Sequence, residues 1–208
     1  MSRTRRAGIA AVYGYLQFGL ALVSGIVLVP FVLARVGTEA YGVWLAFGEL
    51  LAYSAMVELG VVGVLPWLVA EADGRGDRAH MRDLVAAAFA FACLAGVVFA
   101  ALALALVRFA PAAAGLSEAQ RAVVAGPLAL TVAGMALGFP LRTFYAALMG
   151  LQDVGFAGVM SVAQVGLNVV LVIGLLAAGQ GLYALAAAAA APPVFVGVVS
   201  LARLRARA

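Results

Sequence analysis

LVAAAFAFACLAGVVFAALALALV, residues Leu84–Val107, is a run of 24 residues without a charged side chain. A helix that crosses roughly 30 Å of hydrocarbon needs roughly 20 predominantly apolar residues, so this run is long enough to span a bilayer. Strands that span membranes need only roughly 10 residues, and only helices or closed barrels satisfy their backbone there. The run therefore predicts a transmembrane helix.

The rest of the chain has the same character. Hydrophobic residues make up 66% of the 208 residues and charged residues 11%, against about 45–50% and about 25% in soluble domains. No Pro-rich or Ser-rich linker divides residues 1–208, which indicates one all-α, polytopic membrane bundle of about six transmembrane helices. The basic N-terminus is interpreted as the start of an uncleaved first span. The predicted spans are Ala11–Leu33, Tyr41–Leu68, Leu84–Val107, Ala122–Leu148, Phe156–Ala178 and Leu182–Leu201.

Arginines set the predicted orientation. All 13 basic residues are arginines, and cytoplasmic segments of membrane proteins are enriched in them. With the N-terminus inside, nine arginines fall on the cytoplasmic side, three outside and one within a span. An even number of spans then places both termini in the cytoplasm. The membrane predicted for the protein is the cell inner membrane. The inside set is Arg3, Arg5, Arg6, Arg75, Arg78, Arg82, Arg203, Arg205 and Arg207, and the outside set is Arg35, Arg108 and Arg121.

Two carboxylates and one guanidinium lie within the predicted spans. Glu49 and Glu58 are nine residues apart in the second span, so they point to nearly opposite helix faces and cannot act as a pair. A charge at mid-bilayer costs about 2.5–3.5 kcal/mol on insertion scales, so each should face protein or water. Arg142 in the fourth span lies at a depth similar to that of Glu58. Either the two side chains join their helices, or Arg142 lines a cavity while Glu49 or Glu58 couples ion movement.

Uncharged polar side chains form two stripes at helical spacing. Members of each stripe share one face of a predicted helix, which should point inward. They can line an aqueous path or hydrogen-bond one helix to another. The stripes consist of Tyr13, Gln17 and Ser24 in the first span, and of Ser161, Gln164 and Asn168 in the fifth.

Prolines interrupt several of the predicted spans. Each removes a backbone hydrogen bond, and the freed carbonyl needs a partner from a neighbouring helix or water. The pair near the middle of the last span suits either a static kink or the hinge of an interrupted transporter helix. These prolines are Pro30, Pro66, Pro127, Pro140, Pro192 and Pro193.

Local motifs predict one helix start and two close helix contacts. Ser117 followed by Gln120 has the capping-box spacing that would begin the fourth span. The sequence GMALG, Gly134–Gly138, and the alanine run Ala186–Ala191 indicate close backbone approach between helices.

Motifs for covalent chemistry are absent from the sequence. It has no HExxH, GxSxG or P-loop, and its one histidine, His80, lies in a polar loop. The one cysteine, Cys93, lies in an apolar run and can form no disulfide within the chain. We expect no enzyme activity, catalytic residue, cofactor or metal, and no nucleic-acid partner, because the arginines are scattered between spans.

The N-terminal third resembles the lipid-linked oligosaccharide (O-antigen type) flippases, also called polysaccharide biosynthesis proteins. The residues that carry the resemblance are VPFVLARVGTEAYGVW, Val29–Trp44, and VELGV, Val57–Val61, with support from GRGD, Gly74–Asp77, and ALMGLQD, Ala147–Asp153. These flippases belong to the multidrug, oligosaccharidyl-lipid and polysaccharide exporter superfamily. Asp153 departs from the family pattern, which often has a basic residue after GLQ.

The resemblance implies the N-terminal lobe of a two-lobe transporter that moves a polyprenyl-diphosphate-linked saccharide across the membrane without covalent chemistry. Arg142 would contact phosphate, and Gln17, Gln164 and Asn168 would meet the sugars. The expected partners are the lipid bilayer, the saccharide substrate, and a second six-helix lobe or a second copy of the chain. Of these last two partners, the second lobe is favoured, which would make this chain a fragment of a longer protein. The alternatives are a cation-coupled drug exporter, for which Glu49 and Glu58 would serve, and a non-transporting scaffold of polysaccharide assembly.

The predicted topology can be tested by labelling. In a Cys93→Ser chain, single cysteines at Ser2, Gly76 and Ala206 should react with an impermeant maleimide only from the cytoplasmic side. A cysteine at Ser117 should react only from outside. Labelling of Ser2→Cys and Ala206→Cys from opposite sides would contradict an even number of passages.

Overall fold

The computed structural model describes residues 3–54, 56, 60–113 and 115–206. In these residues the regular elements are seven α-helices, which confirms the all-α prediction. The order is α1 (Arg3–Val36), α2 (Thr38–Ser54), α3 (Val61–Gly74), α4 (Arg78–Ala113), α5 (Glu118–Gly150), α6 (Val154–Ala177) and α7 (Leu182–Arg205).

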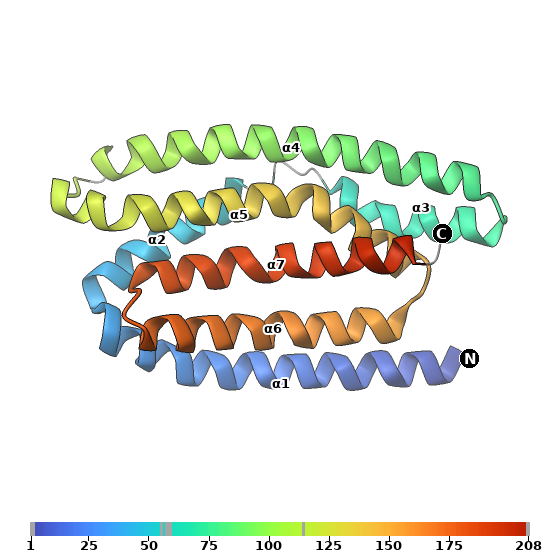
Figure 1. The fold of residues 1–208 in the computed structure, drawn as a ribbon, viewed down its shortest axis with the longest axis horizontal. Helices are drawn as coiled ribbons and strands as arrows, with labels where there is room; N and C mark the ends of the chain where they lie inside the picture. Colours follow the sequence, from blue (N-terminus) through green and yellow to red (C-terminus); the bar gives the residue numbers. More distant parts are fainter. Residues whose placement is uncertain (1–2, 55, 57–59, 114, 207–208) are drawn as a thin grey trace.

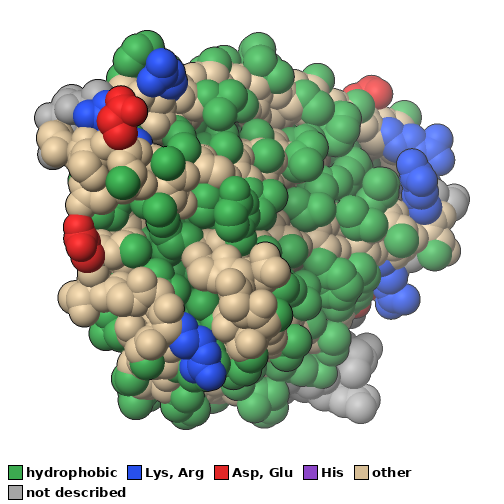
Figure 2. Space-filling view, turned by 60° about the vertical axis from the view of Figure 1, so that its left-hand side comes forward, with side chains coloured by type: hydrophobic (Ala, Val, Ile, Leu, Met, Phe, Trp, Pro, Cys, Tyr) green, Lys and Arg blue, Asp and Glu red, His purple; other side chains and the backbone are tan. Residues whose placement is uncertain are grey.

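Five of the helices are long and apolar enough to cross a membrane: α1, α4, α5, α6 and α7. They lie side by side along the long axis of the molecule (Figure 1). Figure 2 shows hydrophobic side chains over most of one face, with charged side chains gathered toward its left and right. A helix bundle with an apolar outer surface is what a hydrocarbon solvent requires. The chain is a multi-pass membrane protein.

The prediction of one continuous span over Tyr41–Leu68 is wrong. The structure has two shorter helices there, α2 with 17 residues and α3 with 14, about 26 Å and about 21 Å long at 1.5 Å per residue. Gly60, which precedes α3, has φ 73°, a left-handed conformation that ends regular α-helical geometry and that glycine adopts readily. Figure 1 shows α2 along one half of the bundle and α3 along the other.

Both ends of the chain lie at the same end of the bundle (Figure 1). The pair α2 and α3 together makes one passage along the bundle, so α7 finishes where α1 began. Arg75 and Arg78 flank the α3–α4 turn at this end, and Arg203 and Arg205 lie in the last turn of α7. We call it the arginine-rich end. That it faces the cytoplasm stays a prediction.

Helix α5 occupies the centre of the bundle, packed against α3, α4 and α7. In their most apolar segments, 44% of the residues of α5 and of α7 are buried, compared with 6% in α1. Phe139 of α5 is buried against Phe99 of α4, with ring centroids 5.1 Å apart. Helix α1 instead packs mainly on α6 and exposes large apolar side chains. The core therefore lies along α5, and α1 forms an outer edge.

Small residues bring α5 and α7 together, as the GMALG motif and the alanine run predict. A Cβ at Gly134 would collide with the Cβ of Ala190, so these two helices touch at their backbones. At Gly96 of α4, a Cβ would lie 2.8 Å from the carbonyl oxygen of Ala136. That carbonyl is the one that Pro140 leaves without its helical donor. Close contact of α5 with both neighbours thus depends on residues without side chains.

The predicted start of the fourth span is confirmed. The Ser117 N–H donates to Gln120 Oε1 at 2.8 Å, and the Gln120 N–H donates to Ser117 Oγ at 3.3 Å. This reciprocal capping box satisfies two of the N–H groups that lack helical partners at the start of α5. The Gln120 side chain also donates to Glu39 Oε1, which links this helix start to the first turn of α2.

Replacement of Gly134 by alanine should destabilise the protein by about 1–3 kcal/mol, because the added methyl overpacks the α5–α7 contact. Gly174→Ala is the matched control, since no atom lies within 4 Å of a Cβ at that helical position. The free energy of unfolding in mixed micelles measures both variants. Equal stability of the two would contradict backbone contact at Gly134.

Candidate functional site

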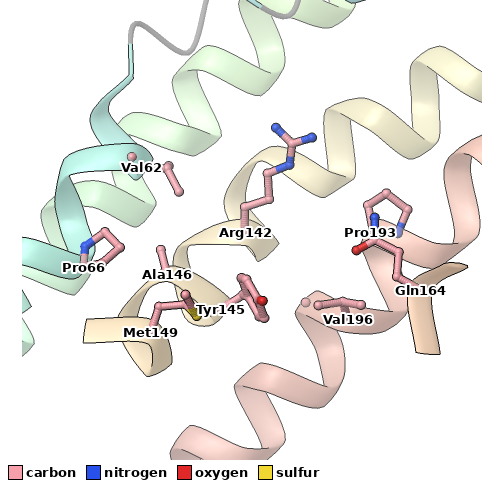
Figure 3. A pocket seen from close by; sticks show the side chains of 11 residues that line it. Val62, Pro66, Arg142, Tyr145, Ala146, Met149, Gln164, Pro193 and Val196 are labelled. Carbon is pink, nitrogen blue, oxygen red and sulfur yellow. The ribbon is translucent and has the colours of Figure 1, made fainter. Parts of the chain in front are cut away.

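A pocket of about 390 Å³ opens between α3, α5, α6 and α7. Figure 3 shows Arg142 of α5 between Val62 of α3 and Pro193 of α7, with Gln164 of α6 beside Pro193. We call it the Arg142 pocket. Its lining consists of Val62, Gly63, Pro66, Arg142, Tyr145, Ala146, Met149, Gln164, Pro193, Val196 and Gly197.

The Arg142 pocket lies between the middle of the bundle and the arginine-rich end. Arg142 precedes the end of α5 by eight residues, about 12 Å of helix, and Gln164 follows the start of α6 by ten, about 15 Å. Both side chains belong to helices long enough to cross the membrane. Polar groups at this depth are rare in membrane helices and almost always face protein or a watery cavity.

Three polar side chains line an otherwise apolar surface. Arg142 and Gln164 are exposed, and the Arg142 guanidinium carbon lies 5.9 Å from the centre of the Phe139 ring. Tyr145 donates a long hydrogen bond, 3.5 Å, to the Ala157 carbonyl of α6. A guanidinium can bind a phosphate through two parallel hydrogen bonds. Amide and phenol groups suit sugar hydroxyls because they both donate and accept.

The pocket brings together two of the four residues predicted to bind substrate, Arg142 and Gln164. Gln17 lies half-buried on α1 and Asn168 lies further along α6, and neither is among the lining residues. Their roles toward a substrate stay predictions. Tyr145 has no predicted role from the sequence, although its position three residues after Arg142 places both on one helix face.

Asn168 forms a hydrogen bond that explains how a proline is tolerated in α7. Its amide nitrogen donates to the Ala188 carbonyl oxygen at 2.8 Å. Ala188 is four residues before Pro192, so its carbonyl lacks the N–H that an ordinary residue would offer. The amide from α6 supplies this missing donor, and α7 remains helical through both prolines. Polar stripes can line an aqueous path or hydrogen-bond one helix to another, and Asn168 does the second.

The serines of the stripes bond within their own helices. Ser24 Oγ donates to the Leu20 carbonyl at 2.6 Å, and Ser161 Oγ to the Ala157 carbonyl at 3.0 Å. Both acceptors lie four residues earlier in the chain, a common way for a hydroxyl to be satisfied in a membrane helix. These two hydroxyls therefore already have acceptors within α1 and α6.

Of the two glutamates in the predicted second span, Glu49 lies among the described residues and Glu58 does not. Glu49 lies exposed on α2 and is not among the lining residues of the Arg142 pocket. Glu58 lies outside the described residues, so its predicted ion pair with Arg142 stays a prediction. Within the described part of the chain, no carboxylate lines the pocket.

No protein-family model, curated protein sequence or solved structure matches this chain. The resemblance of Val29–Trp44 to the flippases therefore stays a prediction from the sequence.

The hydrogen bond of Asn168 can be measured with a double-mutant cycle. Asn168→Leu should reduce the free energy of unfolding by about 1 kcal/mol, because the Ala188 carbonyl loses its donor. In a Pro192→Ala background the same replacement should have little effect, because the backbone N–H restored by that substitution can then donate within α7. Equal losses in both backgrounds would contradict the assignment.

Proposed function

We propose that this chain is a transporter lobe that moves a polyprenyl-diphosphate-linked saccharide across the cytoplasmic membrane for surface polysaccharide synthesis. The observation that carries the proposal is the position of Arg142: this cation lines an open pocket among helices long enough to span the membrane. A guanidinium in that position suits a diphosphate, which carries charge that lipid cannot solvate.

The composition of the Arg142 pocket supports a substrate with a charged centre and a polar head group. Arg142 would hold phosphate, while Gln164 and Tyr145 offer hydrogen-bonding groups within the same pocket. Its volume of about 390 Å³ is in the lower part of the usual range for ligand pockets, about 300–1,000 Å³. Because the pocket is open, the polyprenyl tail would remain in the surrounding lipid.

The energetic cost of placing Arg142 within a span gives the proposal physical weight. An arginine at the centre of a membrane helix is unfavourable by about 2.5–3.5 kcal/mol on insertion scales. Such a residue is retained where it faces a pocket or partner, and intramembrane ionisable residues commonly mark substrate or ion paths. The second lobe, or a second copy, would complete the path on the open side of the pocket.

A cation-coupled drug exporter has less support. Such a site needs a deep carboxylate; Glu49 lies on α2 and does not line the Arg142 pocket, and Glu58 lies outside the described residues. A non-transporting scaffold would have no use for an open pocket lined by an arginine within the spans.

Binding to the chain in nanodiscs tests the proposal. Undecaprenyl diphosphate carrying a disaccharide should bind, and Arg142→Gln should weaken the affinity about tenfold or more, because a charge-assisted hydrogen bond contributes about 1.5–3 kcal/mol. Arg142→Lys should retain part of the affinity.

The matched control is Arg108→Gln, which should leave the affinity within about twofold. Arg108 is an exposed arginine near the C-terminal end of α4. Native mass spectrometry measures bound lipid in each case. Unchanged affinity in Arg142→Gln, with normal folding, would contradict the role of this residue.

A further inference from the structure

A second pocket, of about 400 Å³, lies at the arginine-rich end between α4, α5 and the last turn of α7. Its lining toward the middle of the bundle is apolar, and Phe89 of α4 lies beside Phe144 of α5 there, with ring centroids 5.4 Å apart. Leu151 and Leu204 extend this apolar surface. An apolar hollow beside charged residues at the edge of a membrane protein suits an amphipathic ligand.

Two arginines and one carboxylate also line this pocket. Arg78 and Arg82 lie one turn apart at the start of α4, and Asp73 lies near the end of α3. We call this hollow the Arg78–Arg82 pocket. Two guanidinium groups and one carboxylate leave a formal charge of one positive unit, which complements a single phosphodiester.

Two of the other arginines at this end, Arg75 and Arg203, have carboxylate partners. Arg75 lies 3.3 Å from Glu71, and Arg203 lies 3.4 Å from Asp153. Among the residues that the structure describes, neither Arg78 nor Arg82 makes an ion pair or a side-chain hydrogen bond. Their guanidinium groups are exposed and remain available to an anion.

The order of residues along α4 matches the order of groups in a phospholipid. Arg78 and Arg82 come first, and the apolar residues Val85 and Phe89 follow toward the middle of the bundle. Arg82 and Phe89 are seven residues apart, about 10 Å along the helix. A phosphate beside the arginines would therefore place the start of an acyl chain over the aromatic pair.

We propose that the Arg78–Arg82 pocket binds an anionic glycerophospholipid from the membrane leaflet at the arginine-rich end. The phosphodiester lies between the two arginines, and one acyl chain enters the apolar part lined by Phe89 and Phe144. Basic pockets between membrane helices bind anionic head groups in this way. A zwitterionic lipid brings its own ammonium group and complements the positive charge less well.

This site is separate from the Arg142 pocket, although both use α5. Phe144, Ala147 and Leu151 line the lipid site, whereas Arg142 and Tyr145 line the other. Phe144 follows Arg142 by two residues, so the two side chains point about 200° apart around the helix. The lipid proposal therefore stands independently of the transport proposal.

Titration of the delipidated chain tests the site, with native mass spectrometry as the readout. Phosphatidylglycerol should bind at least tenfold more tightly than phosphatidylcholine or phosphatidylethanolamine of the same acyl composition. Arg78→Gln combined with Arg82→Gln should remove this preference. Arg35→Gln combined with Arg108→Gln, at the opposite end, lowers the net charge equally and should retain it.

A second pair of variants tests the acyl chain without touching the charges. Ala86 is exposed and lines the pocket, so Ala86→Phe should fill it and weaken phosphatidylglycerol binding several-fold. Ala87→Phe, at an exposed neighbour outside the lining, should not. The proposal is overturned if the three lipids bind equally, if the double arginine variant keeps the preference, or if Ala86→Phe binds normally.

Discussion

In hydrocarbon, every backbone carbonyl needs a donor from the protein itself, and this constraint governs how the prolines of the bundle are accommodated. Pro192 leaves the Ala188 carbonyl without a helical partner, and Asn168 supplies one from α6. Pro140 leaves the Ala136 carbonyl free, and it faces Gly96, where no side chain intervenes. Asn168 thus supplies the donor that Pro192 removes, and Gly96 lets α4 pack over the carbonyl that Pro140 leaves without its helical donor.

Residues of α5 and α7 line both the Arg142 pocket and the Arg78–Arg82 pocket. Gly134 meets Ala190 near the middle of these helices, and both pockets lie between this contact and the arginine-rich end. One face of α5 opens toward α3 and α6 at Arg142, and the other opens toward α4 at Phe144. Each hollow has an apolar wall and arginine, but one lies within the spans and the other at the edge of the bundle.

Much of the fold follows from local patterns in the sequence. Apolar run length predicts the five long helices, and Ser117 with Gln120 predicts the start of α5. The break at Gly60 does not follow, because hydropathy carries no information about the sign of φ. The bond from Asn168 to Ala188 joins residues on two helices, so spacing along one helix cannot reveal it. Arg142 and Gln164 stood out as polar residues in apolar runs, whereas their common pocket required the packing of four helices.

The tie between Asn168 and Ala188 has a mechanical consequence for the proline pair in α7. A helix with an unsatisfied carbonyl bends easily, but here the Ala188 carbonyl of α7 accepts a hydrogen bond from Asn168 of α6. A rearrangement that bends α7 at the proline pair must break this hydrogen bond or move α6 together with α7. We therefore expect α6 and the proline-containing part of α7 to move together.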